Sequence, residues 1–374
     1  MTDILIIFVD SLPYALLPQM PNLNTAPEKW SLIPGFGYSV NIHAEMFAGL
    51  LPDDVGYFGE WAYDPAHSPG WKWRGLLPLL DTVCRPYVLN RGLQYLLIQN
   101  YRPQRIMINI PLRYLDMFAL TGDHILDDPA GYPHPSLFTE FPDLRVIPMP
   151  KLPKGERDRK LYVTGIAAIA GSDSLLLPLP DLDGFGHSYG ITGEPYREHL
   201  ARLDTWIPDL TTDFLTRHPQ GHVFVVSDHG MVNVEHAIRL DVEREFGRAT
   251  RQTYAYFSDA NLLRVWAFDE SLRPRLRTYL DTITGCRLVT PEERAEYGLT
   301  SPAFGDLIYV LEEGYAFEPS TFARHKPVGM HGYHPLAPGQ QAVALHYGSP
   351  WCGAPPHRMR DLYEMLRAAL RGTW

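Results

Sequence analysis

The chain has 374 residues, of which 45% are hydrophobic and 20% are charged, and its formal net charge is −10 at pH 7. This composition is typical of a soluble globular protein that is large enough for one large core or two smaller ones. The acidic balance disfavours nucleic acid or an anionic membrane surface as the main partner. The three cysteines, Cys84, Cys286 and Cys352, are far apart and form no CxxC spacing, so neither a disulfide framework nor a thiolate zinc site is expected.

The first residues, MTDILIIFVDSLPY, contain an apolar run, Ile4 to Val9, that ends at Asp10. No basic region precedes this run and no small-residue cleavage site follows it, so we expect a strand and not a signal peptide or a membrane span. Together with the cysteine usage, this favours a reduced, cytoplasmic protein.

Two further apolar runs also end in acidic residues. Leu175 to Pro180 leads to Asp181 and Asp183, and the stretch HVFVVSDHGM from His222 leads to Asp228 and His229. Short apolar runs that are closed by turn residues are typical of buried strands in a parallel sheet. Ligands of such sheets gather beyond the carboxyl ends of the strands, so these acidic residues are candidates for a functional site.

Apolar residues recur at intervals of three and four from Tyr196 to His218, which predicts an amphipathic helix leading into the strand at His222. A helix that connects two apolar strands forms a βαβ unit with parallel strands. The remaining pattern predicts the following elements: a hairpin of Thr253–Phe257 and Leu262–Phe268, a helix at Arg275–Ile283, strands at Asp306–Leu311 and Gln341–Tyr347, and a terminal helix at Pro356–Leu370. The expected fold class is α/β, with a mostly parallel central sheet and helices on both faces.

Ser39 follows a stretch rich in proline and glycine and precedes a helical pattern from Val40 to Leu51, which Pro52 ends. We therefore expect Ser39 to be the N-cap of a helix. A helix N-terminus favours negative charge, so this hydroxyl is the one best placed to be activated as a nucleophile.

The sequence RIMINIP, from Arg105, predicts another strand, and the pattern then loosens. Residues 111–160 are rich in aromatic, proline and acidic residues without a steady period, and we interpret them as an inserted lid. Residues 250–330 are expected to form a smaller cap subregion. Residues 1–374 are otherwise expected to form a single catalytic domain.

Carboxylates and imidazoles gather at the predicted strand ends. Nitrogen and oxygen ligands of this kind suit zinc better than magnesium or calcium, with manganese as an alternative. Asp181 competes with Asp183 for one position, and the spacing of four to His187 favours Asp183. The candidate ligands are Asp10, Asp183, His187, Asp228, His229 and His331.

The order of six motifs resembles the type I phosphodiesterase/nucleotide pyrophosphatase branch of the alkaline phosphatase superfamily. The motifs are FVDSLP, GYSVNIHAEMFAGLLPDDVGY, PDLDGFGHSYG, VVSDHGM, GDLIYVLEEGYAF and GMHGYHP. They cover nearly the whole chain except the region from residue 111 to about 160. The resemblance implies an alkaline-phosphatase-like fold with inserted lid or cap segments.

The resemblance also implies the roles of single residues. One zinc ion would be held by Asp10, Asp228 and His229, with the Ser39 oxygen touching it. A second would be held by Asp183, His187 and His331. Ser39 would attack phosphorus in line, and the phosphoseryl intermediate would then be hydrolysed.

Two positions depart from the family pattern. The nucleophile motif of the family continues with Pro-Asn-His, and here Asn41, Ile42 and His43 occupy those places. The Asn that contacts a phosphate oxygen in nucleotide pyrophosphatases aligns with Glu60, whose carboxylate would repel phosphate. Asn41 is a candidate for a replacement donor. His43 is interpreted as a packing or surface residue, and a supporting role for His334 is left open.

The leading hypothesis is a two-metal hydrolase of a small phosphodiester or pyrophosphate. One alternative keeps the metals but cleaves a phosphomonoester or a phosphonate, and Glu60 motivates it. Another is a metal-stabilised binding protein without catalysis. The expected partner is a small phosphoester, without nucleic acid or a membrane span, and the sequence leaves the oligomeric state open.

Overall fold

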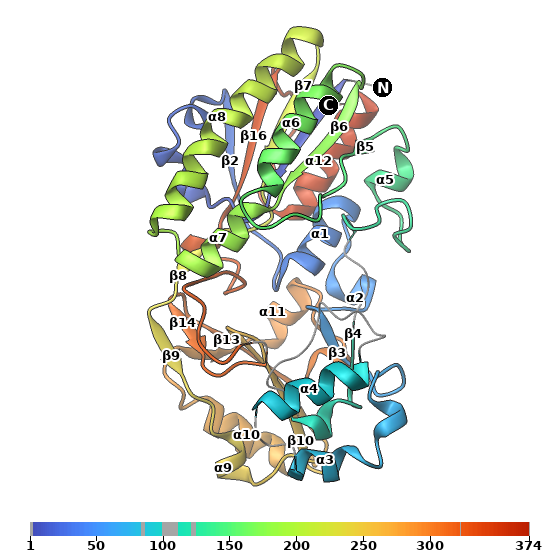
Figure 1. Ribbon diagram of the computed structural model, residues 1–374, viewed down its shortest axis with the longest axis vertical. Helices are drawn as coiled ribbons and strands as arrows, with labels where there is room; N and C mark the ends of the chain where they lie inside the picture. Colours follow the sequence, from blue (N-terminus) through green and yellow to red (C-terminus); the bar gives the residue numbers. More distant parts are fainter. Residues whose placement is uncertain (1–2, 84–86, 99–110, 121–124, 322, 374) are drawn as a thin grey trace. The chain divides into compact units, whose positions relative to one another are not determined.

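The computed structural model describes residues 3–83, 87–98, 111–120, 125–321 and 323–373 (Figure 1). The chain forms two compact units: residues 1–51, 123–233 and 328–374 make up the first, and residues 52–122 and 234–327 the second. The expected lid, 111–160, is thus divided between the two units at residue 122. The expected cap subregion, 250–330, falls in the second unit except for its last three residues.

The first unit is built on a six-stranded sheet. Its four strands β5, β6, β1 and β7 are parallel, and β16 and β2 complete it through antiparallel pairings. The predicted fold class, α/β with a mostly parallel sheet, is confirmed. In sheet order the strands are β2 (Glu28–Leu32), β16 (Ala342–Gly348), β7 (His222–Val226), β1 (Ile4–Val9), β6 (Ser174–Leu179) and β5 (Arg145–Val146).

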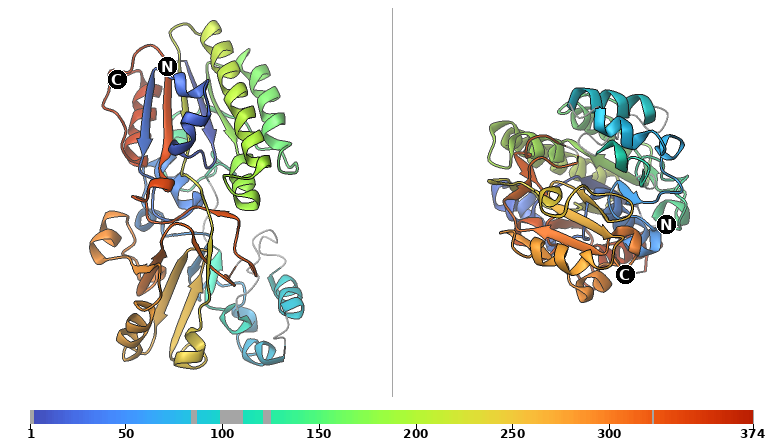
Figure 2. Two further views of the ribbon diagram at one scale, coloured as in Figure 1. Left: turned by 90° about the vertical axis from the view of Figure 1, so that its left-hand side faces the viewer. Right: turned by 90° about the horizontal axis from the view of Figure 1, so that it is seen from below.

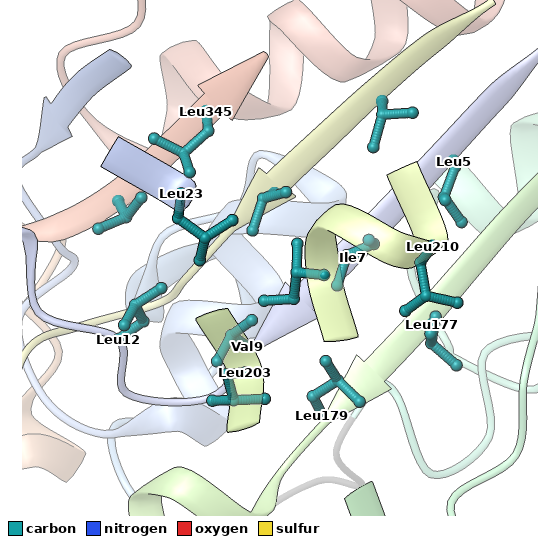
Figure 3. Close-up of a cluster of buried hydrophobic side chains, with 14 of the residues drawn as sticks. Leu5, Ile7, Val9, Leu12, Leu23, Leu177, Leu179, Leu203, Leu210 and Leu345 are labelled. Carbon is teal, nitrogen blue, oxygen red and sulfur yellow. The ribbon is translucent and has the colours of Figure 1, made fainter. Parts of the chain in front are cut away.

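Helices cover both faces of this sheet (Figure 2). Helices α6 (Arg157–Ile169) and α8 (Glu194–Arg217) pack on one face, where leucines of α8 meet alternate residues of β1 and β6 (Figure 3). On the other face, Phe8 of β1 contacts Phe47 of α1 (Ser39–Ala48), and α1 packs against α12 (Met359–Arg371). Burial of apolar residues on both faces explains why the central strands are continuous apolar runs.

Short elements complete the first unit at the ends of the strands. Helix α7 (Asp181–Tyr189) follows β6 directly, and β8 (Val232–Asn233) pairs with β15 (Gly329–Met330). This last pairing brings the residues after β7 beside His331, although the two segments are about 100 residues apart. The others are η1 (Tyr14–Gln19), η2 (Leu23–Thr25), α5 (Leu137–Glu140) and η6 (Pro338–Gln340).

The second unit contains a four-stranded antiparallel sheet in the order β10, β11, β13, β12. The predicted hairpin is confirmed as β10 (Tyr254–Ser258) and β11 (Leu262–Ala267), and β13 (Leu307–Leu311) and β12 (Cys286–Leu288) follow. The other elements are α2 (Pro52–Val55), β3 (Trp61–Tyr63), η3 (Trp71–Trp73), α3 (Leu77–Val83), α4 (Tyr87–Ile98), η4 (Leu112–Tyr114), β4 (Phe118–Leu120), β9 (His236–Ile238), α9 (Val242–Phe246), α10 (Leu272–Leu280), α11 (Pro291–Glu296), η5 (Pro302–Phe304) and β14 (Tyr315–Phe317).

The predicted strand from Arg105 lies outside the described residues, apart from Pro111. Within the described part of the chain, no helix combines the length and the apolar character that crossing a membrane requires.

Candidate metal centre

Three neighbouring parallel strands carry a carboxylate at or just beyond their carboxyl ends. Asp10 directly follows β1, Asp183 lies in the first turn of α7 after β6, and Asp228 comes two residues after β7. Because β1 pairs with both β6 and β7, the three carboxylates reach the same edge of the sheet.

One set of side chains converges on the ring of His229. Its Nε2 atom lies 3.1 Å from Asp228 Oδ2, 3.7 Å from Asp10 Oδ1 and 3.0 Å from Ser39 Oγ. The side chains of Asp228 and His229 are 0% and 1% exposed, so this set is shielded from water. Carboxylate, imidazole and hydroxyl atoms of the set that the resemblance implies for one metal position thus lie together.

A second set converges on Asp183. Its Oδ1 atom lies 3.3 Å from His187 Nε2 and 3.6 Å from His331 Nε2, and one ligand atom from each of the three residues lies within 4.8 Å of the others. The rings of His331 and His229 stack in parallel, with their centroids 3.7 Å apart. Asp183 also falls within 4.8 Å of the ligand atoms of Asp10 and His229, so the two sets adjoin.

Hydrogen bonds fix the tautomers of two of the histidines. His229 Nδ1 is 3.0 Å from the carbonyl of Gly230, and His187 Nδ1 is 2.9 Å from the carbonyl of Gly329. Because a carbonyl only accepts, each Nδ1 carries a proton and donates. Each Nε2 is therefore the ring nitrogen that can coordinate a metal ion, once it carries no proton.

The charges of the cluster favour a bound cation. Burial, followed by repulsion from Asp228 and Asp183, raises the pKa of Asp10 well above its ordinary value. Burial would also raise the pKa values of Asp183 and Asp228, but His187 and His229 respectively hold them below the ordinary value. Among the described residues, the buried Oδ1 atoms of Asp10 and Asp183 accept no hydrogen bond. Divalent cations would neutralise these carboxylates, and the oxygen and nitrogen donors fit zinc or manganese.

Ser39 is the first residue of α1, and the N-cap is Tyr38, so the predicted position was wrong by one residue. The side chain of Asn41, at the third helical position, accepts from the backbone N–H of Tyr38. Ser39 Oγ is consequently free of a capping role and instead lies beside His229. The sequence suggested this hydroxyl as a candidate, and its direction depends on this local capping arrangement.

Asp228 is held by more contacts than the sequence indicated. Its Oδ1 atom accepts the backbone N–H groups of Ser11 and His229, each at 3.0 Å. Its Oδ2 atom lies 3.1 Å from Nε2 of His43, which is buried. His43 was interpreted as a packing or surface residue, so its contact with a candidate ligand was missed. The available signal was its spacing of four from Ser39, which places both on one side of α1.

The structure separates the roles of the two acidic residues after β6. Asp181 Oδ1 accepts from Arg157 Nε at 2.6 Å, and Asp181 Oδ2 accepts the backbone N–H of Asp158 at 3.0 Å. Asp183 instead faces His187 and His331. This geometry favours Asp183 as the ligand, as its spacing to His187 predicted.

The two predicted substrate contacts have less support. Asn41 donates to the carbonyl of Phe36 at 2.8 Å and accepts from the N–H of Tyr38, so a phosphate would have to compete with these bonds. Glu60 belongs to the second unit. Burial raises the pKa of Asp259 there, Arg264 lowers it, and the negative charge of Glu60 raises it further. Both contacts stay predictions. His334 accepts from the N–H of Leu336 and packs edge-to-face on Phe36.

Buried carboxylates and imidazoles beside a serine hydroxyl, at the carboxyl ends of a parallel sheet, define a metal-dependent hydrolase type of site. The sequence profile described as Type I phosphodiesterase / nucleotide pyrophosphatase matches residues 157–334. A search of curated protein sequences gave no match.

Solved structures with the same fold belong to ectonucleotide pyrophosphatase/phosphodiesterase 5. The human protein gives a TM-score of 0.65 at 14% identity, covering 99% of this chain and 95% of that chain. The murine protein gives 0.62 at 15% identity with the same coverage, and its inactive variant in complex with AMP gives 0.63 at 15% identity, again with the same coverage.

The profile match and the shared fold confirm the resemblance seen in the motifs. Over residues 157–334 the chain is similar to the type I phosphodiesterase/nucleotide pyrophosphatase family, and the solved structures share its fold. The predicted enzyme class, a phosphoric ester hydrolase of this type, is confirmed with it.

Proposed function

We propose that the protein hydrolyses a phosphodiester or pyrophosphate bond of a small molecule, with two divalent metal ions, best zinc, and Ser39 as the nucleophile. The observation that carries the proposal is the convergence of Ser39 Oγ, His229 and Asp10 beside the set around Asp183. Asp10, Asp228 and His229 would hold one ion, and Asp183, His187 and His331 the other.

The bound ions would supply Lewis acidity that neutralises phosphoryl charge and lowers the pKa of the Ser39 hydroxyl. Ser39 Oγ then forms a bond to phosphorus while the bond from phosphorus to the leaving oxygen breaks. The positive end of the α1 dipole lies at Ser39 and stabilises negative charge there. Water hydrolyses the phosphoseryl intermediate, and two in-line displacements retain the configuration at phosphorus.

The chain prepares this step by holding its donors in place. The Gly230 and Gly329 carbonyls orient the rings of His229 and His187 through Nδ1, so that each Nε2 faces the carboxylates. His43 and the Ser11 N–H orient Asp228. The site therefore needs little rearrangement on binding metal and substrate, which is where enzymes of this kind gain much of their rate.

The proposal is tested with Ser39→Ala and an aryl phosphodiester in the presence of zinc. The variant should bind metal but lose hydrolysis by at least about a thousandfold, because it lacks the proposed nucleophile. Ser31→Ala is the matched control, since Ser31 lies on β2 and its hydroxyl contacts Gln341, and it should keep full activity. Full hydrolysis by Ser39→Ala would reject the phosphoseryl mechanism.

A phosphomonoester or phosphonate substrate is the second candidate, and Glu60 at the position of the usual Asn favours it. Comparing the wild-type kcat/KM for an aryl phosphodiester and the corresponding monoester separates the two. A large preference for the monoester would overturn the diester assignment while leaving the metal centre intact.

A further inference from the structure

Helix α3 in the second unit turns aliphatic side chains outward and its charged side chain inward. Leu76, directly before the helix, Leu79 and Val83 recur at intervals of three and four, so they share one side. They are 51%, 63% and 67% exposed. Asp81 is 7% exposed, and its carboxylate accepts from Arg248 at 2.6 Å. This is the reverse of a helix whose apolar stripe faces the core.

Helix α4 has the same reversed arrangement. Its inner side carries Gln94, which is 0% exposed and donates to Asn90 Oδ1 at 2.6 Å. Its outer side carries a stripe of large apolar residues that are 47% to 76% exposed: Val88, Leu89, Tyr95 and Leu96. Residues seven apart lie on the same side of a helix, so these two pairs form one stripe. Contiguous exposed apolar surface of this kind marks an interaction site.

The short helix η3, which precedes α3, adds aromatic and basic side chains. Trp71 and Trp73 are 43% and 40% exposed, and Lys72 and Arg74 beside them are exposed as well. The Arg74 guanidinium lies 4.1 Å from the centroid of the Trp71 ring. Tryptophan, with an apolar body and a polar N–H, and long basic side chains are suited to the boundary between lipid headgroups and acyl chains. We call η3 and the outer sides of α3 and α4 the α3/α4 surface.

The exposed charges of the α3/α4 surface are positive. In the described part of residues 71–98 they are Lys72, Arg74 and Arg91, while the acidic residue of this part, Asp81, is buried. The formal net charge of −10 belongs to the whole chain. Salt screens exposed charges beyond about 8 Å at physiological ionic strength, so the basic residues determine the field at this surface.

An anionic bilayer fits this surface better than a second copy of the chain does. A two-fold dimer places the same patch on both sides of its interface, so the basic residues of one copy would face the same basic residues of the other. Anionic headgroups would instead neutralise these charges, while the acyl boundary takes up the aliphatic side chains. Both properties of the surface are then satisfied by one partner.

The length of α4 decides how it would meet a bilayer. Its 12 residues extend over about 18 Å, which is shorter than the hydrocarbon core of about 30 Å. The helix would therefore lie in the plane of the interface. We propose that the α3/α4 surface attaches the protein peripherally to an anionic lipid bilayer, with its apolar side chains at the acyl boundary and Lys72, Arg74 and Arg91 at the headgroups. The inference goes beyond the proposed function and does not depend on it.

Flotation of the full chain with vesicles tests the proposal. One set of vesicles is phosphatidylcholine alone, and in the other about 30% of the lipid is phosphatidylglycerol, which supplies negative charge. The double variant Leu79→Ser/Leu96→Ser removes one apolar contact from each helix. The double variant Lys72→Gln/Arg74→Gln removes two positive charges and leaves the aliphatic side chains in place.

Two double variants outside this surface are the matched controls. Leu152→Ser/Val163→Ser changes apolar residues that are 40% and 56% exposed. Arg202→Gln/Arg239→Gln changes arginines whose side chains are 50% and 79% exposed. Circular dichroism and thermal unfolding confirm that each variant is folded, and sedimentation without lipid gives its oligomeric state.

Wild type should float with the anionic vesicles, bind phosphatidylcholine at least about tenfold more weakly, and dissociate as salt is raised from about 0.1 M to about 0.5 M. Lys72→Gln/Arg74→Gln should weaken anionic binding by about 10- to 30-fold and Leu79→Ser/Leu96→Ser by at least about tenfold, while both controls bind as wild type. Absence of flotation, or equal binding by wild type and both α3/α4 variants, would overturn the inference. A dimer without lipid that Leu79→Ser/Leu96→Ser converts to monomers would also overturn it, because a second copy would then cover the surface.

Discussion

At the scale of single residues, the candidate centre depends on how each donor is held. Asp228 accepts two backbone N–H groups and also contacts His43 and His229. A carboxylate that is held at both oxygens presents a fixed lone pair to an ion. Residues that orient a ligand in this way commonly affect metal affinity nearly as much as the ligand does.

His43→Ala should therefore weaken metal binding at the first position by about 10- to 100-fold, because Asp228 loses one of its partners. His218→Ala is the control: His218 also pairs with an aspartate, Asp3, at 3.0 Å, but it precedes β7, at the other end of the strand. Zinc titration with a competing chelator measures the affinities. Equal affinities for wild type and His43→Ala would contradict the positioning role.

Glu45 links the stability of α1 to pH. Burial raises its pKa from 4.5 to about 7, although Arg360 and Arg358 lower it. The pKa of Glu45 is higher in the folded state than in the unfolded state. Its carboxyl group therefore contributes its full stabilisation below about pH 4.5, and this contribution is lost as pH rises through about 7. Glu45→Gln should consequently be more stable than wild type at pH 8, by up to about 3 kcal/mol, and the difference should shrink toward pH 5.

Urea unfolding at pH 5 and pH 8 measures this difference. Glu364→Gln on α12 is the control, because its side chain is 66% exposed, and it should not change the pH dependence. A Glu45→Gln protein with the same pH profile as wild type would show that Glu45 does not titrate in the folded state near neutral pH.

At the scale of elements, helix α7 is positioned by a buried network that ties it to α6 and α8. Asp158 Oδ1 accepts the N–H of Asp181, and the N–H of Asp158 donates to Asp181 Oδ2, so each carboxylate caps the N-terminus of the other helix. His199 of α8 contacts Asp158 Oδ2 at 2.8 Å. The network sets the start of the helix that carries Asp183 and His187.

Asp158→Ala should cost about 3 kcal/mol of unfolding free energy, because the buried His199 ring and the N–H of Asp181 lose their acceptor. It should also weaken metal binding at the second position. Asp209→Ala on α8 is the control, since its carboxylate accepts a hydrogen bond from Tyr162 at an exposed site, and its effect should be within about 0.5 kcal/mol. Denaturation of metal-free protein measures the stability. A change no larger than that of Asp209→Ala would contradict the role of the network.

The sequence predicted those elements whose pattern is set by burial. Strands β1, β6 and β7 and helix α8 lie within two residues of their predicted bounds, because both faces of the strands and one side of the helix are apolar. Strand β2 was not predicted, since EKWSL is partly exposed at the sheet edge. Helix α7 was not predicted either, because DLDGFGHSY has low helix propensity and depends on the capping network.

The candidate site also has features that the sequence pattern predicts and features that depend on the tertiary fold. The rule that ligands gather beyond the carboxyl ends of parallel strands, with the resemblance, brought the six candidate ligands together from the sequence. The contacts of Ser11 and His43 with Asp228 were not predictable, because they join residues more than 180 positions apart. Hydrogen bonds of this kind depend on the tertiary fold and leave no local pattern in the sequence.

At the scale of the whole molecule, the first unit contains every proposed metal ligand and Ser39, while the second unit contains Glu60. The first unit is made of three separate segments of the chain, so its folding depends on contacts distant in sequence. The buried carboxylates Asp10, Asp183 and Asp228 repel one another without a cation. Metal binding should therefore stabilise the whole protein.

Asp10→Asn should change the thermal stability of the protein in opposite directions with and without metal. In chelator, it should raise Tm by a few degrees above wild type, because one buried negative charge is removed from the cluster. With saturating zinc, wild type should be the more stable, because it binds the ion more tightly. Thermal unfolding under both conditions measures the crossover. A variant that is less stable than wild type in chelator as well would contradict the electrostatic argument.

The central claim is that the cluster at the ends of β1, β6 and β7 holds the metal ions of a phosphoester hydrolase. Elemental analysis, made on the same preparations as the hydrolysis assay, tests it most directly. We predict about two divalent ions per chain, lost together with activity on chelation and regained together when zinc is restored. Protein that hydrolyses phosphoesters at the full rate with no bound metal would contradict the claim.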